Sequence, residues 1–149
     1  MKKIAIFLVL FFCEGCDRNG DYVKRVYKVE NSSGHEITVV AHSLNEGSIY
    51  WSRHILTNGV IWEGHSDNGL GREISASRAL GKTDSVVVTF DNLKRQIYYF
   101  SNYGAASSPK VFRNIFIDST YTIESNELYR FIFTEEDYNM AEDCGGKCN

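Results

Sequence analysis

The sequence predicts a mainly β protein, an antiparallel β-sandwich or partly open barrel of about seven to nine short strands with a short C-terminal helix. Two observations favour this fold class. Short runs rich in Val, Ile, Tyr, Phe and Thr recur along the chain, and clusters of Gly, Asn, Asp and Ser separate them. These runs do not alternate with helical patterns, so parallel βαβ units are not expected. A chain of 149 residues can bury one core of this kind.

Alternation and turn residues predict the first strands. Four apolar runs lie at residues 22–30, 36–43, 48–56 and 60–62. In the second run, every other side chain from Ile37 to Ala41 falls on one face. Asn58-Gly59 separates the third run from the fourth, and it predicts a β-hairpin because both residues tolerate positive φ.

Further strands are predicted after an irregular segment. Residues 64–81 carry four glycines and predict a long loop with at most one short strand, at residues 73–77. Later runs predict strands at residues 84–90, 97–100, 114–118, 121–124 and 127–133. Asp91-Asn92 predicts the turn after the first of these, and the last one alternates with its aromatic side chains on one side.

The predicted helix lies near the C-terminus. Thr134 is a favourable N-cap, and the three acids at residues 135–137 suit the positive end of a helix dipole. Adjacent carboxylates on one helical turn diverge, so they do not form the facing acid pair of a glycosidase. The last six residues, 144–149, are expected to form a flexible tail.

The N-terminus has the pattern of an export signal. Lys2 and Lys3 precede an apolar run at residues 4–12, which is shorter than the roughly 20 residues of a membrane-spanning helix. Gly15 directly before Cys16, just past that run, resembles the lipobox of bacterial lipoproteins. The resemblance implies cleavage between Gly15 and Cys16 and a diacylglycerol on the sulfur of Cys16. An ordinary signal peptide cut near Gly15, or an uncleaved anchor, is the alternative.

This pattern divides the chain into a signal peptide at residues 1–15, a lipidated tether at 16–21, a single β domain at 22–143 and the tail. We expect a location outside the cytoplasm, anchored by lipid to the outer membrane. The inner membrane is the alternative, because Asp17 follows the cysteine directly and such an aspartate retains some lipoproteins there. The formal net charge of −3, without a basic stripe, makes nucleic acid a poor partner. The expected partners are the membrane and an envelope protein or glycan.

Two cysteines close the sequence in the spacing Cys144-Gly145-Gly146-Lys147-Cys148. Outside the cytoplasm thiols oxidise, so this segment predicts either a small disulfide or two free thiols. Two thiols without a nearby histidine are too few for structural zinc. No metal or cofactor is expected.

The catalytic motifs in the sequence are incomplete. His35-Glu36 begins like a zinc-protease motif, but Val39 stands where the second histidine belongs. The glycine-rich segment 64–71 lacks the lysine and hydroxyl of a phosphate-binding loop. We therefore predict no catalytic residue.

Aromatic residues are abundant, with nine Tyr, nine Phe and two Trp. Trp51, Trp62 and Tyr99 are candidates to face a ligand or a partner protein, because flat rings with polar edges are typical of binding surfaces. Adjacent strand residues face opposite ways, so one of Tyr98 and Tyr99 points outward. The other interpretation is that these rings fill a sandwich core.

Residues 128–144 are similar to small uncharacterised lipoproteins of Gram-negative bacteria, a likeness that implies a class and no activity. We therefore expect a non-enzymatic binding or accessory module of the envelope. The alternatives are a small envelope hydrolase acting on glycan or peptide, and an inhibitor or immunity partner. A cleft that holds a histidine or two converging carboxylates would favour the hydrolase.

Overall fold

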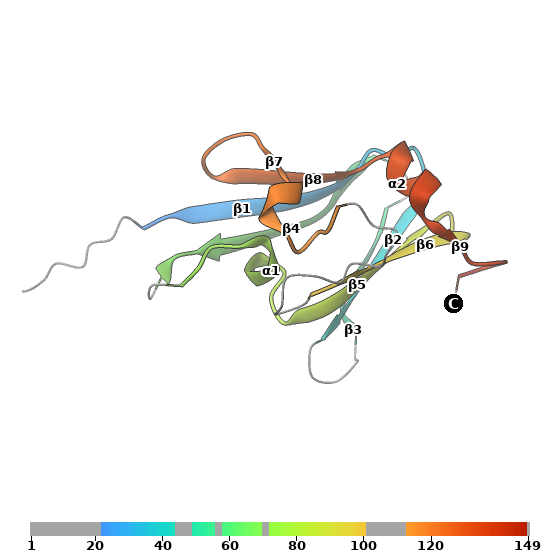
Figure 1. Ribbon diagram of the computed structural model, residues 1–149, viewed down its shortest axis with the longest axis horizontal. Coiled ribbons are helices and arrows are strands. Elements are labelled where there is room, and N and C mark those ends of the chain that lie inside the picture. The colour runs from blue at the N-terminus through green and yellow to red at the C-terminus, as the bar shows by residue number, and fades with distance from the viewer. Residues whose placement is uncertain (1–21, 44–48, 56–57, 70–71, 101–112, 149) are drawn as a thin grey trace, which may run out of the picture.

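The computed structural model describes residues 22–43, 49–55, 58–69, 72–100 and 113–148, and in them it shows two packed β-sheets (Figure 1). The expected signal peptide, the cleavage site at Gly15-Cys16 and the tether lie outside the described residues. The strands are β1 (Lys24–Asn31), β2 (Ile37–Ser43), β3 (Ile49–Ile55), β4 (Gly59–Asp67), β5 (Thr83–Phe90), β6 (Lys94–Tyr99), β7 (Thr122–Ile123), β8 (Leu128–Phe133) and β9 (Glu142–Asp143). Two short helices are α1 (Ala76–Ala79) and α2 (Glu135–Met140).

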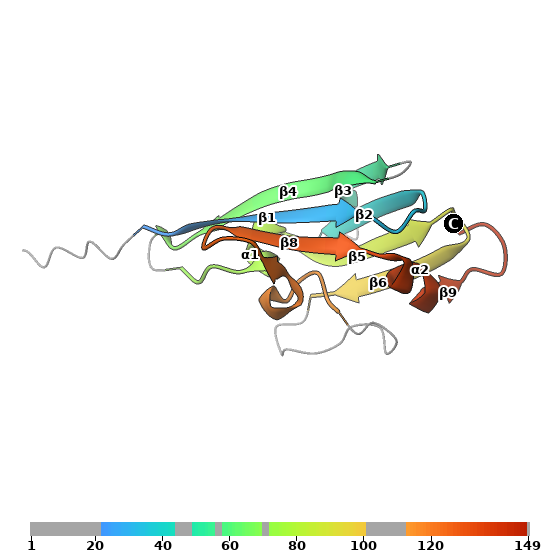
Figure 2. The same ribbon diagram turned by 90° about the horizontal axis from the view of Figure 1, so that it is seen from above.

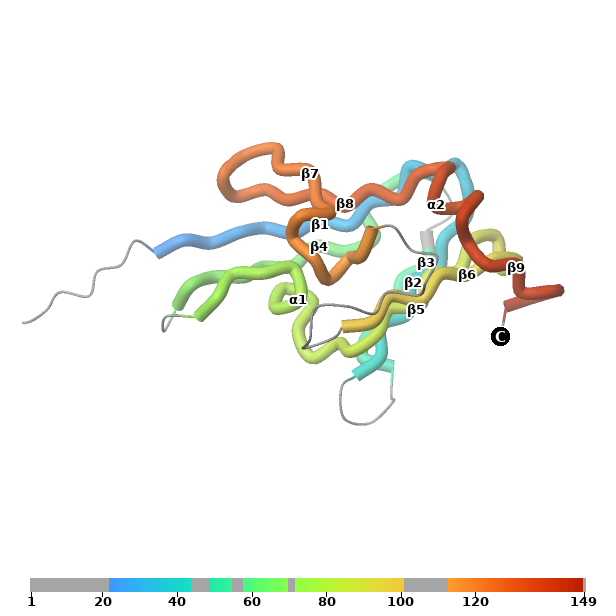
Figure 3. Tube along the Cα trace, viewed as in Figure 1, coloured from blue at the N-terminus to red at the C-terminus, as the bar shows by residue number. Residues whose placement is uncertain are grey.

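The sheets form a sandwich, as predicted. One has four strands in the order β4-β1-β8-β7, and the other has five in the order β3-β2-β5-β6-β9 (Figure 2). Every pair is antiparallel except β1 and β8, which run parallel from Val26 opposite Leu128 to Asn31 opposite Phe133. The first strand and the last long strand are thus neighbours in space (Figure 3).

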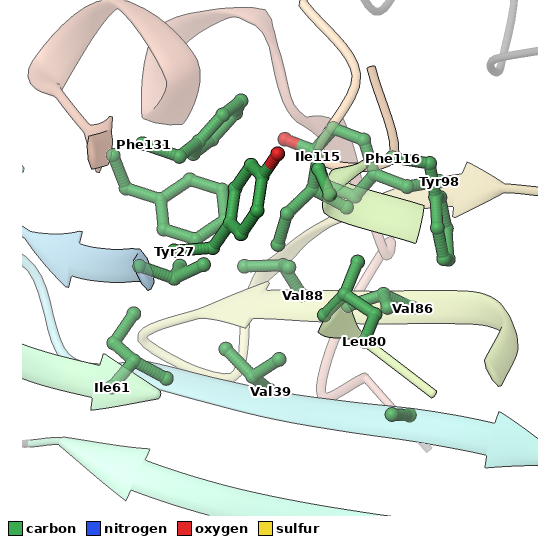
Figure 4. Packing of buried hydrophobic residues seen from close by; sticks show 14 of the residues in the cluster. Tyr27, Val39, Ile61, Leu80, Val86, Val88, Tyr98, Ile115, Phe116 and Phe131 are labelled. Carbon is green, nitrogen blue, oxygen red and sulfur yellow. The ribbon is translucent and has the colours of Figure 1, made fainter. Parts of the chain in front are cut away.

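The core lies between the two sheets and is rich in aromatic side chains. Alternate residues of β2 from Ile37 to Ala41, and of β8 from Tyr129 to Phe133, are buried, which confirms the faces predicted for both strands. Figure 4 shows Phe131 above Val39, with side chains of the two sheets meeting between them. This burial is the main stabilising term of the fold.

Helix α1 is where the sequence predicted at most a strand, at residues 73–77. Ala76 and Leu80 are both buried, and their i, i+4 spacing suits one face of a helix. Ser75 caps the helix by accepting a hydrogen bond from the backbone N–H of Arg78. The N–H of Ala76 donates to Asp118 at 2.6 Å, which fixes the helix against the segment before β7.

Two further strand predictions were wrong. The hairpin expected at Asn58-Gly59 does not form, because β3 pairs with β2 while β4 pairs with β1, in the other sheet. Residues 114–117 form a turn rather than a strand, and a short 3-10 helix begins at Asp118. The side chain of Asn114 accepts from the N–H of Phe116 at 3.0 Å, a local bond that competes with sheet pairing.

The C-terminal segment differs from the expected flexible tail. Cys144 and Cys148 form a disulfide with a Cα–Cα distance of 5.3 Å. Their backbone N–H groups donate to the carbonyls of Leu93 and Asn92, each at 2.9 Å. The closed loop is therefore held against the turn between β5 and β6. This turn was predicted at Asp91-Asn92, and both residues adopt positive φ in it.

Candidate ligand-binding groove

A groove runs along one side of the sandwich, between the edge strand of one sheet and the edge strand of the other. β3 contributes Tyr50, Trp51 and Arg53, β4 contributes residues 60–64, and α1 with the turn after it contributes residues 79–81. Its volume is about 590 Å³. Small-molecule sites usually span about 300–1,000 Å³, so the groove has the size of a ligand site.

A β-bulge in each edge strand brings two consecutive residues to the groove side of that strand. The register of β3 with β2 skips Tyr50, and the register of β4 with β1 skips Ile61. Tyr50 and Trp51 both line the groove, as do Ile61 and Trp62. Successive side chains of a regular strand point to opposite faces, so the bulges account for this arrangement.

The two tryptophans of the chain lie together in the groove. The indole planes of Trp51 and Trp62 are parallel within 7° and their ring centroids are 6.1 Å apart. Both rings pack against the core and stay partly exposed. A Cβ added at Gly64 would lie 2.1 Å from Cζ2 of Trp62, so only glycine leaves room for this indole.

The rim of the groove is apolar and exposed. Tyr50 has 51% of its surface accessible and Val60 has 50%. The phenol of Tyr50 reaches over Gly81, where an added Cβ would be 3.2 Å from its hydroxyl. Exposed apolar side chains that lie close together are typical of interaction surfaces.

The described lining of the groove also carries one charge of each sign and one unusual donor. Glu63 forms an ion pair with Lys28 of β1 at 3.2 Å, and Arg53 donates to the carbonyl of Ser52 at 3.0 Å. The indole N–H of Trp51 is buried and donates to no acceptor in the part of the chain that the structure describes. An unpaired buried donor costs about 1–3 kcal/mol, so this group favours any ligand that brings it an acceptor.

His35 lies outside the groove, in a cluster that joins two turns and a helix. Its Nδ1 is 2.6 Å from Asp91 and its Nε2 is 3.0 Å from Glu135, while the ring stacks on Tyr138 at 3.5 Å. The carboxylates contact opposite nitrogens of the ring and do not converge on one point. The cluster therefore ties the turn before β2, the β5–β6 turn and α2 together.

His54 forms a second polar chain on the outer face of the five-stranded sheet. Its Nδ1 is 2.8 Å from the hydroxyl of Thr38, and its Nε2 is 3.1 Å from Glu36. Half of the imidazole is exposed, and none of the three residues lines the groove. Among the described residues no group of three His, Cys, Asp or Glu side chains could hold a metal ion.

Three buried tyrosines support the core rather than the groove. Burial raises the pKa of Tyr98 and of Tyr121 well above the ordinary value of 10.0. Burial also raises the pKa of Tyr27, and a hydrogen bond with Arg25 partly opposes that shift. The phenol of Tyr27 donates to Asp118 at 3.0 Å, so these groups act as neutral donors inside the fold.

The structure brings together two of the three aromatic residues that the sequence singled out. Trp51 and Trp62 share the groove, whereas Tyr99 lies on β6, outside the groove and 46% exposed. Tyr98 is fully buried, which confirms that one ring of this pair points outward. Cys16, the predicted lipidation site, lies outside the described residues.

Sequence reasoning missed Arg53, Glu63 and Gly64. In the sequence, Arg53 and Glu63 look like ordinary strand residues. They line the groove only because their strands lie at the edges of the two sheets. One signal could have found Gly64: it follows Trp62, the last residue of an apolar run, by two positions, so both lie on the same face of a strand. Glycine inside a strand often marks a place where another group approaches the backbone closely.

No known protein family, curated protein or solved structure matches this chain. The described helices are all too short or too polar to cross a membrane. The site itself defines a class: a β-sandwich with an aromatic groove between its two sheets.

Proposed function

We propose that this chain is a non-enzymatic binding module of the bacterial cell envelope, and that the groove between β3 and β4 is its binding site. The observation that carries the proposal is that both tryptophans of the chain line one groove of about 590 Å³. Binding sites are concave, and polar groups beside apolar surfaces orient the ligand. This groove is concave and sets aromatic rings beside polar groups.

The proposal includes export and a lipid anchor on Cys16. Its support is the N-terminal sequence, with a basic start, a short apolar run and Gly15 before the cysteine. From Cys16 to Tyr22 the chain can span at most about 20 Å. An anchored domain would thus sit close to the membrane, with the start of β1 nearer to the membrane than α2 and β9 at the opposite end of the long axis (Figure 1).

A binding role has more support than hydrolysis. Among the described residues, those that line the groove include one acid, Glu63, one base, Arg53, and no histidine. His54 contacts the hydroxyl of Thr38 and the carboxylate of Glu36, but these three groups lie on an outward face and not in a cleft. A hydrolase needs its nucleophile and base beside a bound substrate.

The anchor is tested by replacing Cys16 with alanine in the full chain. The wild-type protein should gain the mass of a diacylglycerol, lose residues 1–15 and fractionate with membranes. The Cys16→Ala protein should carry no lipid and leave the membrane fraction after a salt wash. A wild-type protein without lipid would refute the anchor and leave the groove proposal standing.

The binding role is tested by tryptophan emission, because every tryptophan of the chain reports on the groove. Glycan, peptide and lipid fractions of the native envelope are added in turn to the full chain in detergent. At least one fraction should shift the emission, and the shift should be lost in Trp62→Ala. Tyr99→Ala, which removes an exposed ring outside the groove, should respond like the wild type. If no fraction shifts the emission, the groove is not a binding site.

A further inference from the structure

We infer that the ligand of the groove is an uncharged oligosaccharide, held by stacking of its sugar rings on the faces of Tyr50, Trp51 and Trp62. This inference rests on the proposed binding function and adds the chemical class of the ligand. A pyranose ring has an apolar face of C–H groups and a rim of hydroxyls. It therefore needs flat apolar surfaces with hydrogen-bonding groups at their edges.

The aromatic side chains supply the flat surfaces. Trp51 and Trp62 stack on each other with their planes parallel within 7°, and both rings pack against the core and stay partly exposed. A sugar ring would therefore stack on the part of each indole that the other indole and the core leave accessible. Packing against the core restricts the ring of Trp62, so little conformational entropy is lost when a ligand stacks on it. Tyr50 extends this surface at the rim, with half of its area accessible.

The charged side chains of the groove suit a neutral ligand rich in hydroxyls. Arg53 donates hydrogen bonds and Glu63 accepts them, and together they contribute no net charge to the lining. Glu63 is already paired with Lys28, which leaves little excess field to attract a cationic ligand. A strongly anionic ligand would meet Glu63, and a hydrocarbon would take water away from Arg53 and from the Glu63–Lys28 pair without giving either a new hydrogen bond.

The form of the two strand edges argues against an extended peptide. A peptide that adds a strand requires a regular row of free backbone groups along an edge. Here a bulge at Tyr50 interrupts β3 and a bulge at Ile61 interrupts β4. Bulges and charged side chains are devices that prevent edge pairing, and these edges carry both.

The unpaired indole N–H of Trp51 gives the inference a specific signature. A sugar hydroxyl or ring oxygen can accept from this donor, which has no acceptor in the described part of the protein. The atom is buried, so the ring must turn toward the ligand before the bond can form. Its resonance should therefore move more than that of Trp62 on binding.

The experiment uses the full chain, labelled with nitrogen-15 and purified in a detergent without a sugar headgroup. An array of neutral oligosaccharides identifies the best binder, and a parallel array of extended peptides tests the competing class. The two indole N–H resonances are then followed during titration with that oligosaccharide. Both should shift, with the larger shift at Trp51. Trp62→Ala should weaken binding at least about tenfold, as expected for a central aromatic contact.

Control variants separate stacking from folding. Trp51→Phe keeps a flat ring without the N–H and should weaken binding less than Trp51→Ala does, while Tyr99→Ala should bind within about twofold of the wild type. If no oligosaccharide binds, or if binding survives Trp62→Ala in a folded protein, the inference is wrong. If peptides bind instead, and Trp62→Ala abolishes that binding, the sugar class is wrong and the proposed function stands. If neither array binds, both proposals fail.

Discussion

Replacing Gly64 with alanine tests the geometry of the groove directly. A Cβ at this position would lie 2.1 and 2.3 Å from Cζ2 and Cη2 of Trp62, and 2.9 Å from the carbonyl oxygen of Ala79. Nonbonded carbon atoms prefer to stay about 3.5–4.0 Å apart. The backbone at Gly64 is not in the left-handed region, so the substitution adds a steric clash and no φ strain. Either the indole or strand β4 must move.

The cost follows from two opposing terms. Overpacking a well-packed site costs about 1–3 kcal/mol. A less flexible unfolded chain returns about 0.4–1 kcal/mol for a Gly→Ala change. Gly64→Ala should therefore lower the free energy of unfolding by up to about 2.5 kcal/mol, which for a domain of this size lowers the melting temperature by up to roughly 10 °C. Tryptophan emission should shift to the red as the displaced indole of Trp62 meets water.

Thermal unfolding and emission spectra measure both effects. Gly69→Ala is the matched control, because the nearest atom to its added Cβ is the movable carboxylate tip of Asp67. In a Trp62→Ala background the clash at residue 64 is reduced to the contact with the carbonyl of Ala79, so Gly64→Ala should cost less there. A Gly64→Ala protein with the melting temperature and emission of the wild type would show that the indole does not lie on Gly64.

Three further predictions concern the rest of the domain. Asp137→Ala should lower the free energy of unfolding by about 3 kcal/mol, because it removes the ion-pair partner of the partly buried Arg113 and the capping bonds of α2. Unfolding in urea measures this loss, and a value below about 1 kcal/mol would contradict the prediction. Reducing the Cys144–Cys148 disulfide should cost no more than about 2 kcal/mol, since it closes a loop with a sequence separation of 4; melting with and without reductant measures it, and global unfolding on reduction would refute it. Tyr98 and Tyr121 should keep their protons above pH 10.0 in the folded protein, whereas the unfolded chain loses them, so the free energy of unfolding should fall as the pH rises past that value. Tyrosinate absorbance during a pH titration measures this. The prediction is wrong if every phenol ionises before the protein unfolds.

The sequence was sufficient for features that depend on local alternation. The buried face of β2 from Ile37 to Ala41, the turn at Asp91-Asn92 and the cap of α2 at Thr134 were all predicted, because each is decided by residues within a few positions of one another. Alternation also predicted that one ring of Tyr98 and Tyr99 points outward, but only the structure shows which one it is.

Strand pairing could not be predicted in the same way. Asn58-Gly59 is a good hairpin signal, yet β3 and β4 part at this point and enter different sheets. The parallel pairing of β1 with β8 joins strands from opposite ends of the chain. Pairing partners are set by which faces can be buried together across the whole sandwich, and a local turn preference is small beside that burial.

The groove was the least predictable feature because it depends on two bulges that no local pattern specifies. Without the extra residue at Tyr50, alternation would direct that ring and Trp51 to opposite faces, and the same holds for Ile61 and Trp62. The bulges have a second effect at the same place, since they interrupt the free edges of β3 and β4 that would otherwise invite another strand to pair. An edge strand must prevent pairing with other strands, whereas a binding surface must expose apolar rings. One extra residue in each strand meets both needs. The bulges thus protect these edges from strand pairing, and under the proposed function they also place the rings on which a ligand would stack.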